Sequence, residues 1–130
     1  MFKSYLLFLT TTLVLSNSPL GTHLENFLKA QSPSIAITSL SKGISTGSST
    51  SKNVFKLSFI TSNTTNNFNE EDIILYNAEI VSFSGKNDTY NAKLKILNKG
   101  IATVEVYGYS FTDSEGNFNV DSDQFVVFKN

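Results

Sequence analysis

Tyr90-Asn91-Ala92-Lys93-Leu94-Lys95-Ile96 alternates apolar and polar side chains with a period of two. Successive side chains of a β-strand point to opposite faces of its sheet, so this pattern predicts a strand with one buried and one solvated face. The residues expected to point inward are Tyr90, Ala92, Leu94 and Ile96. Slipping this strand by one residue would bury Lys93 and Lys95, so the pattern also specifies the register.

Shorter segments of the same kind lie on both sides of this strand. We expect further strands at 34–38, 55–61, 73–76, 78–83, 102–109 and 124–128. In 55–61 the alternation places Phe55, Leu57 and Phe59 inward, and Lys56 and Ser58 outward. In 102–109 it places Val104 and Val106 inward. The polar stretches 41–51 and 62–67 are typical of loops.

The connections between these segments favour a sandwich. Turn-forming residues recur about every ten positions, which is the spacing expected of a sandwich or a barrel. Asn98-Lys99-Gly100 predicts a turn that joins 90–96 to 102–109 as a hairpin. Eight of the eleven phenylalanines lie between Phe55 and Phe128, enough to fill the space between two sheets. We therefore predict an all-β, immunoglobulin-like sandwich of about seven antiparallel strands.

Composition limits both the class of protein and its partners. Hydrophobic residues make up 40% and charged residues 16% of the 130 residues, a balance typical of a chain that folds as one domain. The formal net charge is −1 and all ten basic residues are lysines, so we expect no nucleic-acid partner. The absence of cysteine excludes disulfides, thiolate metal sites and cysteine nucleophiles.

The first 18 residues have the pattern of a signal peptide. Lys3 precedes a mostly apolar run from Tyr5 to Leu15, and small residues follow at positions 16 and 18. The run is short for a membrane span, and the alternatives are an uncleaved anchor or an ordinary buried segment. We expect residues 1–18 to be a signal peptide with an open cleavage site, 19–32 a linker, and 33–130 the sandwich domain. The protein is then secreted or held at the cell surface, and it contacts a membrane only through an uncleaved leader.

Five pieces of the sequence, in order, resemble a bacterial immunoglobulin-like repeat. They are PSIAITS (33–39), FKLSFITS (55–62), FNEEDIILYNAEIVSFSGKNDTYNAKLKI (68–96), GIATVEV (100–106) and FTDSEGNFNVDSDQF (111–125). Such repeats occur many times over in large adhesins and other surface proteins. The resemblance implies a β-sandwich that acts as a spacer, stalk or adhesive unit without catalytic activity.

Three details of that family fall on residues of this chain. In the family, Asp72-Ile73 begins a short strand, Phe83-Ser84-Gly85 leads into a tight turn, and the stretch from Thr112 to Asn117 forms a loop before the last strand. The sequence departs from the family at 62–67, where an acidic residue and a proline are common, and it holds one copy of the repeat.

The stretch from Asp113 to Asp123 concentrates oxygen-bearing side chains and contains no lysine. Calcium takes six to eight oxygen ligands, and the residues that could supply several of them are Asp113, Glu115, Asn117, Asn119 and Asp121. The helix-loop-helix calcium pattern is not matched, because Gly116 stands at the fourth position and Gln124 at the twelfth. The alternative is an acidic, turn-rich connection that its charges keep soluble.

Two further groups of side chains suggest chemistry or binding. Tyr107 and Tyr109 flank Gly108 on one face of a predicted strand and could form an aromatic platform for a sugar; the alternative is core or cross-strand packing. The three carboxylates of residues 70–72 are adjacent, so a strand would point them to opposite faces, and we expect a solvated edge instead of an acid–base pair. His23, the only histidine, lies in the linker, which leaves serine and threonine hydroxyls without a base.

These features together predict a non-enzymatic module that acts in adhesion or as a structural or interaction domain. Its partner would be a protein or a glycan on a surface, and its oligomeric state is left open. The alternative is a small secreted protein that binds calcium or carbohydrate.

Overall fold

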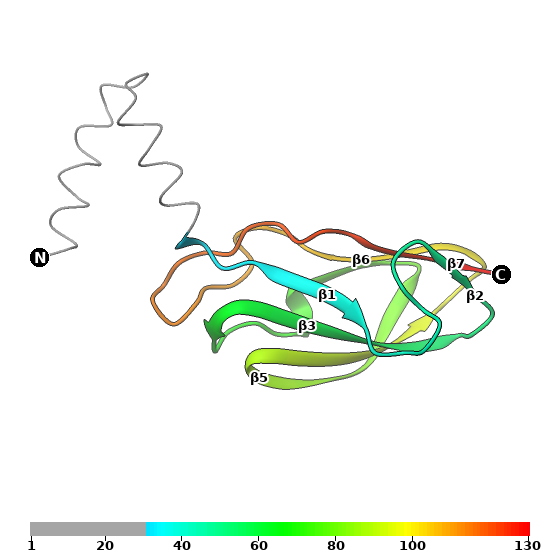
Figure 1. Cartoon of the computed structure of the whole chain (residues 1–130), viewed down its shortest axis with the longest axis horizontal. Helices are drawn as coiled ribbons and strands as arrows, with labels where there is room; N and C mark the ends of the chain where they lie inside the picture. The colour runs from blue at the N-terminus through cyan, green and yellow to red at the C-terminus, as the bar shows by residue number, and fades with distance from the viewer. Residues whose placement is uncertain (1–30) are drawn as a thin grey trace, which may run out of the picture. The chain divides into compact units, whose positions relative to one another are not determined.

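Seven β-strands and one short 3-10 helix form the regular structure of residues 31–130, the part of the chain described by this computed structural model (Figure 1). The strands are β1 Ile35–Ser39, β2 Ser48–Thr50, β3 Val54–Thr65, β4 Ile73–Tyr76, β5 Ala78–Ile96, β6 Gly100–Val106 and β7 Phe125–Lys129, and the helix is η2 Glu70–Asp72. The predicted signal peptide, His23 and all but the last two residues of the predicted linker lie outside the described residues. Residues Pro33–Asn130 form one compact unit.

The strands divide between two sheets, which confirms the predicted all-β class. One sheet has the order β1-β3-β5 and the other the order β2-β7-β6-β4. Neighbouring strands are antiparallel except for β2 and β7, which run parallel. The prediction of antiparallel strands is therefore wrong at this one pair.

The first sheet has the predicted inward and outward faces. Tyr90, Ala92, Leu94 and Ile96 are all at most 3% exposed, while Asn91, Lys93 and Lys95 lie in solvent. Phe55, Leu57 and Phe59 are buried in the same way on β3. Ser58 was expected in solvent but is buried, because its small side chain sits on the central strand between Thr38 of β1 and Asn91 of β5.

The long strand β5 turns back on itself around Gly85. The amide of Leu97 donates to the carbonyl of Asn77, and Lys95 forms an ion pair with Glu79 at 3.7 Å, so the segment from residue 78 to 83 runs beside the segment from 90 to 96. Gly85 has φ +143° and Asn87 has φ 63°, backbone conformations that the tight turn requires and that glycine and asparagine tolerate best. The tight turn predicted after Phe83-Ser84-Gly85 is confirmed.

The predicted hairpin between 90–96 and 102–109 is wrong. Strand β6 pairs with β4 and β7 in the other sheet, so residues 97–99 cross between the layers. Asn77, at φ 57°, holds this crossing: its Nδ2 donates to the carbonyls of Asn98 and Ile101, and its Oδ1 accepts from the amide of Asn98. A polar turn between two alternating segments is compatible with a hairpin within one sheet or with a crossing between the sheets. The side chain of Asn77, about twenty positions earlier, stabilises the crossing.

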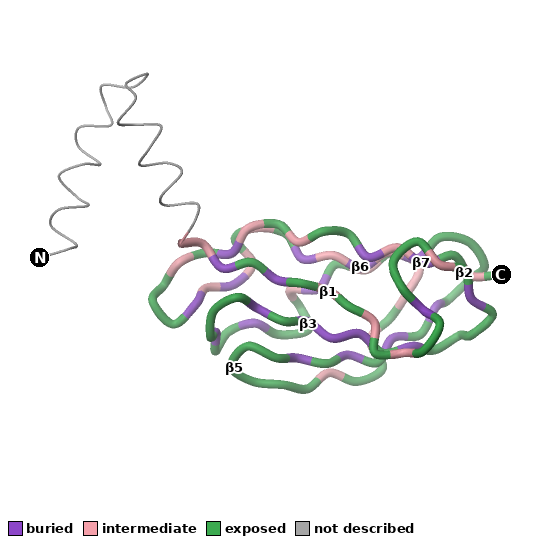
Figure 2. The backbone as a smooth tube through the Cα atoms, in the orientation of Figure 1, coloured by how far each residue is buried: buried purple, intermediate pink, exposed green. Residues whose placement is uncertain are grey.

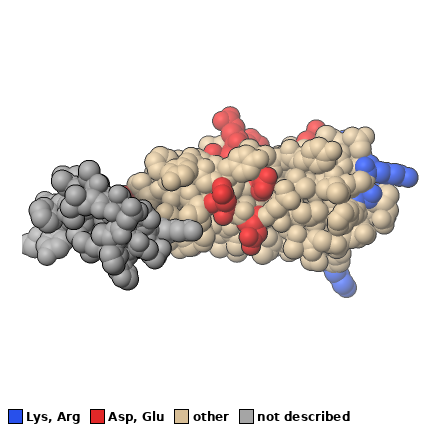
Figure 3. Space-filling view, turned by 90° about the horizontal axis from the view of Figure 1, so that it is seen from above, with Lys and Arg blue, Asp and Glu red and all other residues tan. Residues whose placement is uncertain are grey.

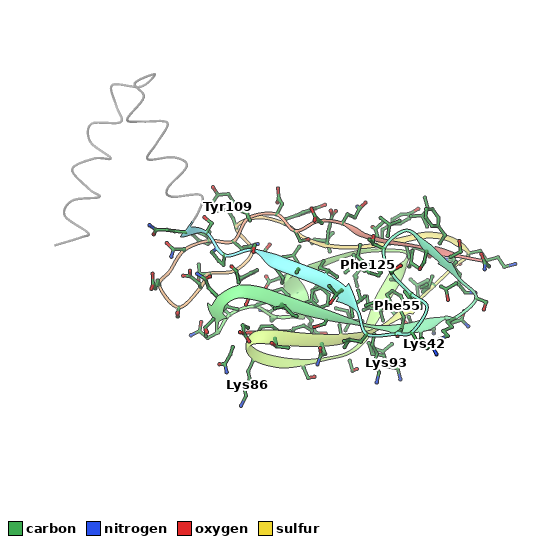
Figure 4. All side chains as sticks on the ribbon, in the orientation of Figure 1. Lys42, Phe55, Lys86, Lys93, Tyr109 and Phe125 are labelled. Atoms are coloured by element: carbon green, nitrogen blue, oxygen red, sulfur yellow. The ribbon has the colours of Figure 1, made fainter. Side chains whose placement is uncertain are left out.

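The core lies between the two sheets (Figure 2). Phe55 of β3 stacks on Phe125 of β7 across the interface (Figure 4). Toward the other end, Phe68 contacts four aromatic rings, those of Phe59, Phe83, Tyr90 and Phe111, at centroid distances of 5.0 to 6.0 Å. Phenylalanines therefore fill the space between the sheets as predicted, although Phe118 and Phe128 are exposed.

Three segments differ most from the prediction, and the remaining boundaries shift by one or two residues. Residues 48–50, expected in a loop, form β2, because their partner β7 is distant in sequence and supplies the hydrogen bonds. Strand β3 continues through 62–65, where the buried Thr65 hydroxyl donates to the carbonyl of Thr112 at 2.6 Å. Strand β6 ends at Val106 and does not reach Tyr109.

Candidate functional site

The candidate site is the long connection from Tyr107 to Gln124, which leads from β6 to β7. Within it, Thr112 and Phe118 form an isolated antiparallel bridge, and the residues between them turn at Gly116, which has φ +87°. The amide of Ser114 donates to the carbonyl of Thr64, which joins the connection to the end of β3. The loop predicted at 112–117 is confirmed, and we call the whole connection the 107–124 loop.

Asp113 organises the turn of this loop. Its Oδ1 accepts hydrogen bonds from the amides of Glu115 and Asn117, and its Oδ2 accepts from the side-chain amides of Asn63 and Asn117, all at 2.9 to 3.1 Å. Burial by itself raises the pKa of Asp113, but the hydrogen bonds from Asn117, Asn63 and Glu115 outweigh it and hold the pKa below the usual aspartate value. The carboxylate is therefore ionised and fully engaged by donors of its own chain.

Asn119 performs a similar role at the base of the loop. It is 2% exposed; its Oδ1 accepts from the amides of Ser110 and Phe111, and its Nδ2 donates to the carbonyls of Tyr107 and Val120. Asp121 accepts from the amide of Gly108 at 2.5 Å. These hydrogen bonds within the loop fix its conformation.

The five residues predicted as calcium ligands thus serve different purposes. Asp113 and Asn119 are buried and saturated with hydrogen bonds, whereas Glu115 and Asp121 are exposed and Asn117 is half-buried. Within residues 31–130 no group of three or more histidine, cysteine or carboxylate side chains is placed to hold a metal ion. A bound cation would have to displace the donors around Asp113, so the geometry favours the structural role, and calcium binding stays a prediction.

The paired tyrosines are arranged differently from either interpretation of the sequence. They lie beyond the end of β6, and Tyr109 has φ 63°, so the prediction that they share a strand face is wrong. Tyr107 is 52% and Tyr109 80% exposed, so packing in the core is wrong as well. The ring of Tyr109 contacts the ring of Phe118, itself 50% exposed, at a centroid distance of 5.5 Å and a tilt of 49°. Figure 4 labels Tyr109 on this loop.

Sequence reasoning missed Phe118 as a member of this aromatic group. It was counted among the phenylalanines that fill the core, and only the bridge between Thr112 and Phe118 carries it to the side of Tyr109. A signal was available in the sequence, because Phe118 stands between Asn117 and Asn119 in a turn-rich stretch where burial is uncommon.

Asn63, in the segment expected to be a polar turn, contributes to the same end of the molecule. Its side-chain amide donates to Asp113 and so acts as a structural donor to this carboxylate. Asn67 donates to the hydroxyl of Thr112 and accepts from the amide of the same residue. The polar residues at 62–67 therefore fasten the 107–124 loop to β3.

The acidic group at 70–72 has a structural role in the described geometry. The amide of Asn69 donates to Asp72, and the amide of Glu71 donates to the side chain of Asn69, which forms a capping box around η2. Desolvation by burial is the main cause that raises the pKa of Asp72. Glu70 and Glu71 are exposed. As predicted, a strand begins at Ile73 directly afterwards.

No helix among residues 31–130 is long and apolar enough to span a bilayer. Comparison of the chain with known protein families, with curated proteins and with solved structures gave no match.

Proposed function

We propose that residues 33–130 form an immunoglobulin-like module of an exported or cell-surface protein that acts in adhesion or as a structural or interaction domain and not as an enzyme. The observation that carries the proposal is the division of the N-terminal strands between the sheets: β1 pairs with β3, but β2 pairs in parallel with the last strand, β7. An immunoglobulin-like order would place the first, second, fourth and fifth long strands in one sheet and the third, sixth and seventh in the other. The orders β1-β3-β5 and β2-β7-β6-β4 agree with this scheme when the two segments of β5 count as separate strands.

The use of polar side chains supports the non-catalytic part of the proposal. The buried or partly buried polar side chains at the loop end, Asp113, Asn119 and Asp72, are engaged in hydrogen bonds that hold backbone turns. A catalytic group must instead be free to meet a substrate in a plausible pose. A rigid loop end with exposed aromatic rings suits recognition of a surface.

Export is tested with the full chain carrying a C-terminal tag, expressed in a bacterium and followed by cell fractionation. We expect the protein outside the cytoplasm, and a variant with Leu6→Lys and Leu7→Lys in the apolar run to remain inside. Variants at Leu40 and Leu97, two leucines exposed on the folded domain, serve as the matched control and should be exported normally. Retention of the unaltered chain in the cytoplasm would contradict the proposal.

A second candidate function rests on the exposed aromatic pair of Tyr109 and Phe118, with the exposed Tyr107 on the same loop, which favours a small carbohydrate-binding protein. A glycan array probed with and without EDTA distinguishes the carbohydrate from the calcium alternative. Binding that is lost in Tyr109→Ala but kept in Tyr76→Ala, an exposed tyrosine on the second sheet, would support this function. Binding unchanged in both variants would exclude the aromatic group as its site.

A further inference from the structure

Lysines gather at one end of the sandwich, which we call the lysine end and define by Lys42, Lys52, Lys56, Lys93, Lys95, Lys99 and Lys129. Hydrogen bonds and strand pairing join them: Lys52 Nζ donates to the carbonyl of Lys42, Lys129 Nζ donates to the carbonyl of Ser51, and Lys129 pairs with Gly100 next to Lys99. Seven of the eight lysines among residues 31–130 belong to this end, and the eighth is Lys86. On the face drawn in Figure 3 the lysines lie toward the end where the chain finishes, and the carboxylates lie across the middle of the face.

These lysines are poorly neutralised by the protein itself. The ion pair between Lys95 and Glu79 is the one found among the described residues, and both of its side chains are more than half exposed. Lys56 and Lys93 are direct register partners on the outward face of β3 and β5. Like charges opposite each other weaken a sheet, so the stability of the fold does not explain this pair of lysines. Binding of an anionic partner to the two lysines would explain it.

The complementary charge lies away from the lysine end, from the middle of the module to the tip of the 107–124 loop. Loop segments 62–72 and 107–124, which Asn63, Asp113 and Ser114 hold together, contain seven carboxylates and no lysine. We call this the acidic end; the members that lie in solvent are Glu70, Glu71, Glu115, Asp121 and Asp123. The lysine end, with seven lysines and the carboxylate of Glu79, has a net charge of +6, and the acidic end has −7.

The two ends are too far apart to neutralise each other. Ile73, directly after Glu70–Asp72, pairs with Val106, and the amide of Ser122 donates to the carbonyl of Val106. Val106 lies six positions along β6 from Gly100, the partner of Lys129, which is about 20 Å at the rise of an extended strand. Charges in solvent are screened over about 8 Å at physiological ionic strength. Each end therefore presents its own field to the surroundings.

We propose that the lysine end docks the acidic end of a second copy of this chain, so that modules associate head to tail. Such a contact joins two different surfaces, and it propagates into a row unless its geometry closes a ring. The second copy is the favoured anionic partner because every molecule carries an acidic end that matches the lysine end in sign and nearly in magnitude. The inference goes beyond the proposed function, since association in solution does not depend on export.

Sedimentation velocity of the full chain, over concentrations up to about 1 mM, tests the docking at two ionic strengths. We expect concentration-dependent association at about 20 mM NaCl that weakens at least tenfold at about 500 mM, because exposed ion pairs are screened by salt. A chain that stays monomeric at low salt overturns the proposal. So does a monomer that is retained on a polyphosphate column, which would assign the lysine end to an anionic polymer.

Charge-reversal variants make the test specific to the two ends. Lys56→Glu with Lys93→Glu lowers the net charge of the lysine end from +6 to +2, and Glu70→Lys with Glu71→Lys changes that of the acidic end from −7 to −3. Each should associate at least tenfold more weakly alone, and mixing the two should restore association. Lys86→Glu is the matched control, because it reverses a lysine outside the lysine end and should associate as the unaltered chain does. Equal loss in the control, or no recovery on mixing, overturns the proposal; circular dichroism verifies that every variant is folded.

Discussion

The ring of Phe55 in β3 lies almost parallel to the ring of Phe125 in β7, with centroids 6.2 Å apart and 19° between the ring planes. Phe55 is 1% and Phe125 3% exposed, and the two strands belong to different sheets. This contact joins the layers through apolar side chains alone. The fold, and with it the rigid loop end, depends on such contacts because the chain has no disulfide to replace them.

Truncating this contact should cost a large part of the stability. We expect Phe55→Ala to lower the free energy of unfolding by about 3–5 kcal/mol, because it removes a buried ring and leaves a cavity. Urea unfolding measures the change. Phe128→Ala is the control: Phe128 lies on the outward face of β7, 39% exposed, and should cost about 1 kcal/mol or less. Equal losses in the two variants would contradict the two-layer core.

Gly85 should not tolerate a side chain. At φ +143° a Cβ would collide with the carbonyl oxygen of Thr89 and the Cα of Tyr90, both backbone atoms that cannot move aside. We expect Gly85→Ala to lower the free energy of unfolding by more than about 3 kcal/mol, or to prevent folding. Gly43→Ala also has a positive φ, +80°, but meets no atom within 4 Å, and should cost only about 1 kcal/mol. Melting temperatures of the two variants measure the difference, because Gly43→Ala adds backbone strain alone and Gly85→Ala adds strain together with a steric clash.

Asp113 should make stability depend on pH in the acid range. Hydrogen bonds hold its pKa below the ordinary 3.8, so the unfolded chain takes up its proton at a higher pH than the folded chain does. The stabilisation is therefore complete above the ordinary value and is lost as the pH falls through the lower, folded pKa. Asp113→Asn should reduce stability at pH 7 by about 1–3 kcal/mol, and the difference from the unaltered chain should shrink below about pH 4.

The comparison between chains isolates Asp113 from Asp72, whose raised pKa acts in the opposite direction. Asp123→Asn, at an exposed position, is the matched control and should change stability by less than about 0.5 kcal/mol. Urea unfolding between about pH 2 and pH 7 supplies the measurements. A difference between Asp113→Asn and the unaltered chain that stays constant with pH would show that the carboxylate is not stabilised in its ionised form.

Calcium should leave the stability of the 107–124 loop nearly unchanged. The oxygens of Asp113 already accept four hydrogen bonds, and a cation would have to break them before it gained ligands. We expect the melting temperature to change by less than about 1 °C between EDTA and millimolar Ca²⁺. A larger rise, abolished by Glu115→Gln with Asp121→Asn, would instead support the calcium site predicted from the sequence.

The sequence predicted the inward-facing side chains correctly in strands that bury one face and expose the other. The alternation at 90–96 and 55–59 placed seven inward side chains correctly, because burial on one face leaves a period of two that is visible locally. The break at Asn77 between the strands expected at 73–76 and 78–83, and the turn after Gly85, were also predictable, since residues that tolerate a positive φ mark them.

The features that could not be predicted from the sequence depend on interactions with residues that are distant along the chain. Strand β2 has three small polar residues and exists because β7, nearly eighty positions later, pairs with it. The crossing at 97–99 is decided by Asn77. At the candidate site, the acidic composition suggested metal ligands. The side-chain oxygens of Asp113 and Asn119 instead accept hydrogen bonds from Asn63 and from backbone turns. The spacing of residues in the sequence does not predict the geometry of these turns.

The pairing of β2 is the most direct test of an immunoglobulin-like sandwich, and nuclear Overhauser contacts between backbone protons measure it. We predict contacts of a parallel pair between residues 48–50 and 127–129, together with antiparallel contacts between 35–39 and 57–61. Antiparallel contacts between 48–50 and 35–39, which would place the first two strands in one sheet as a hairpin, would contradict the account.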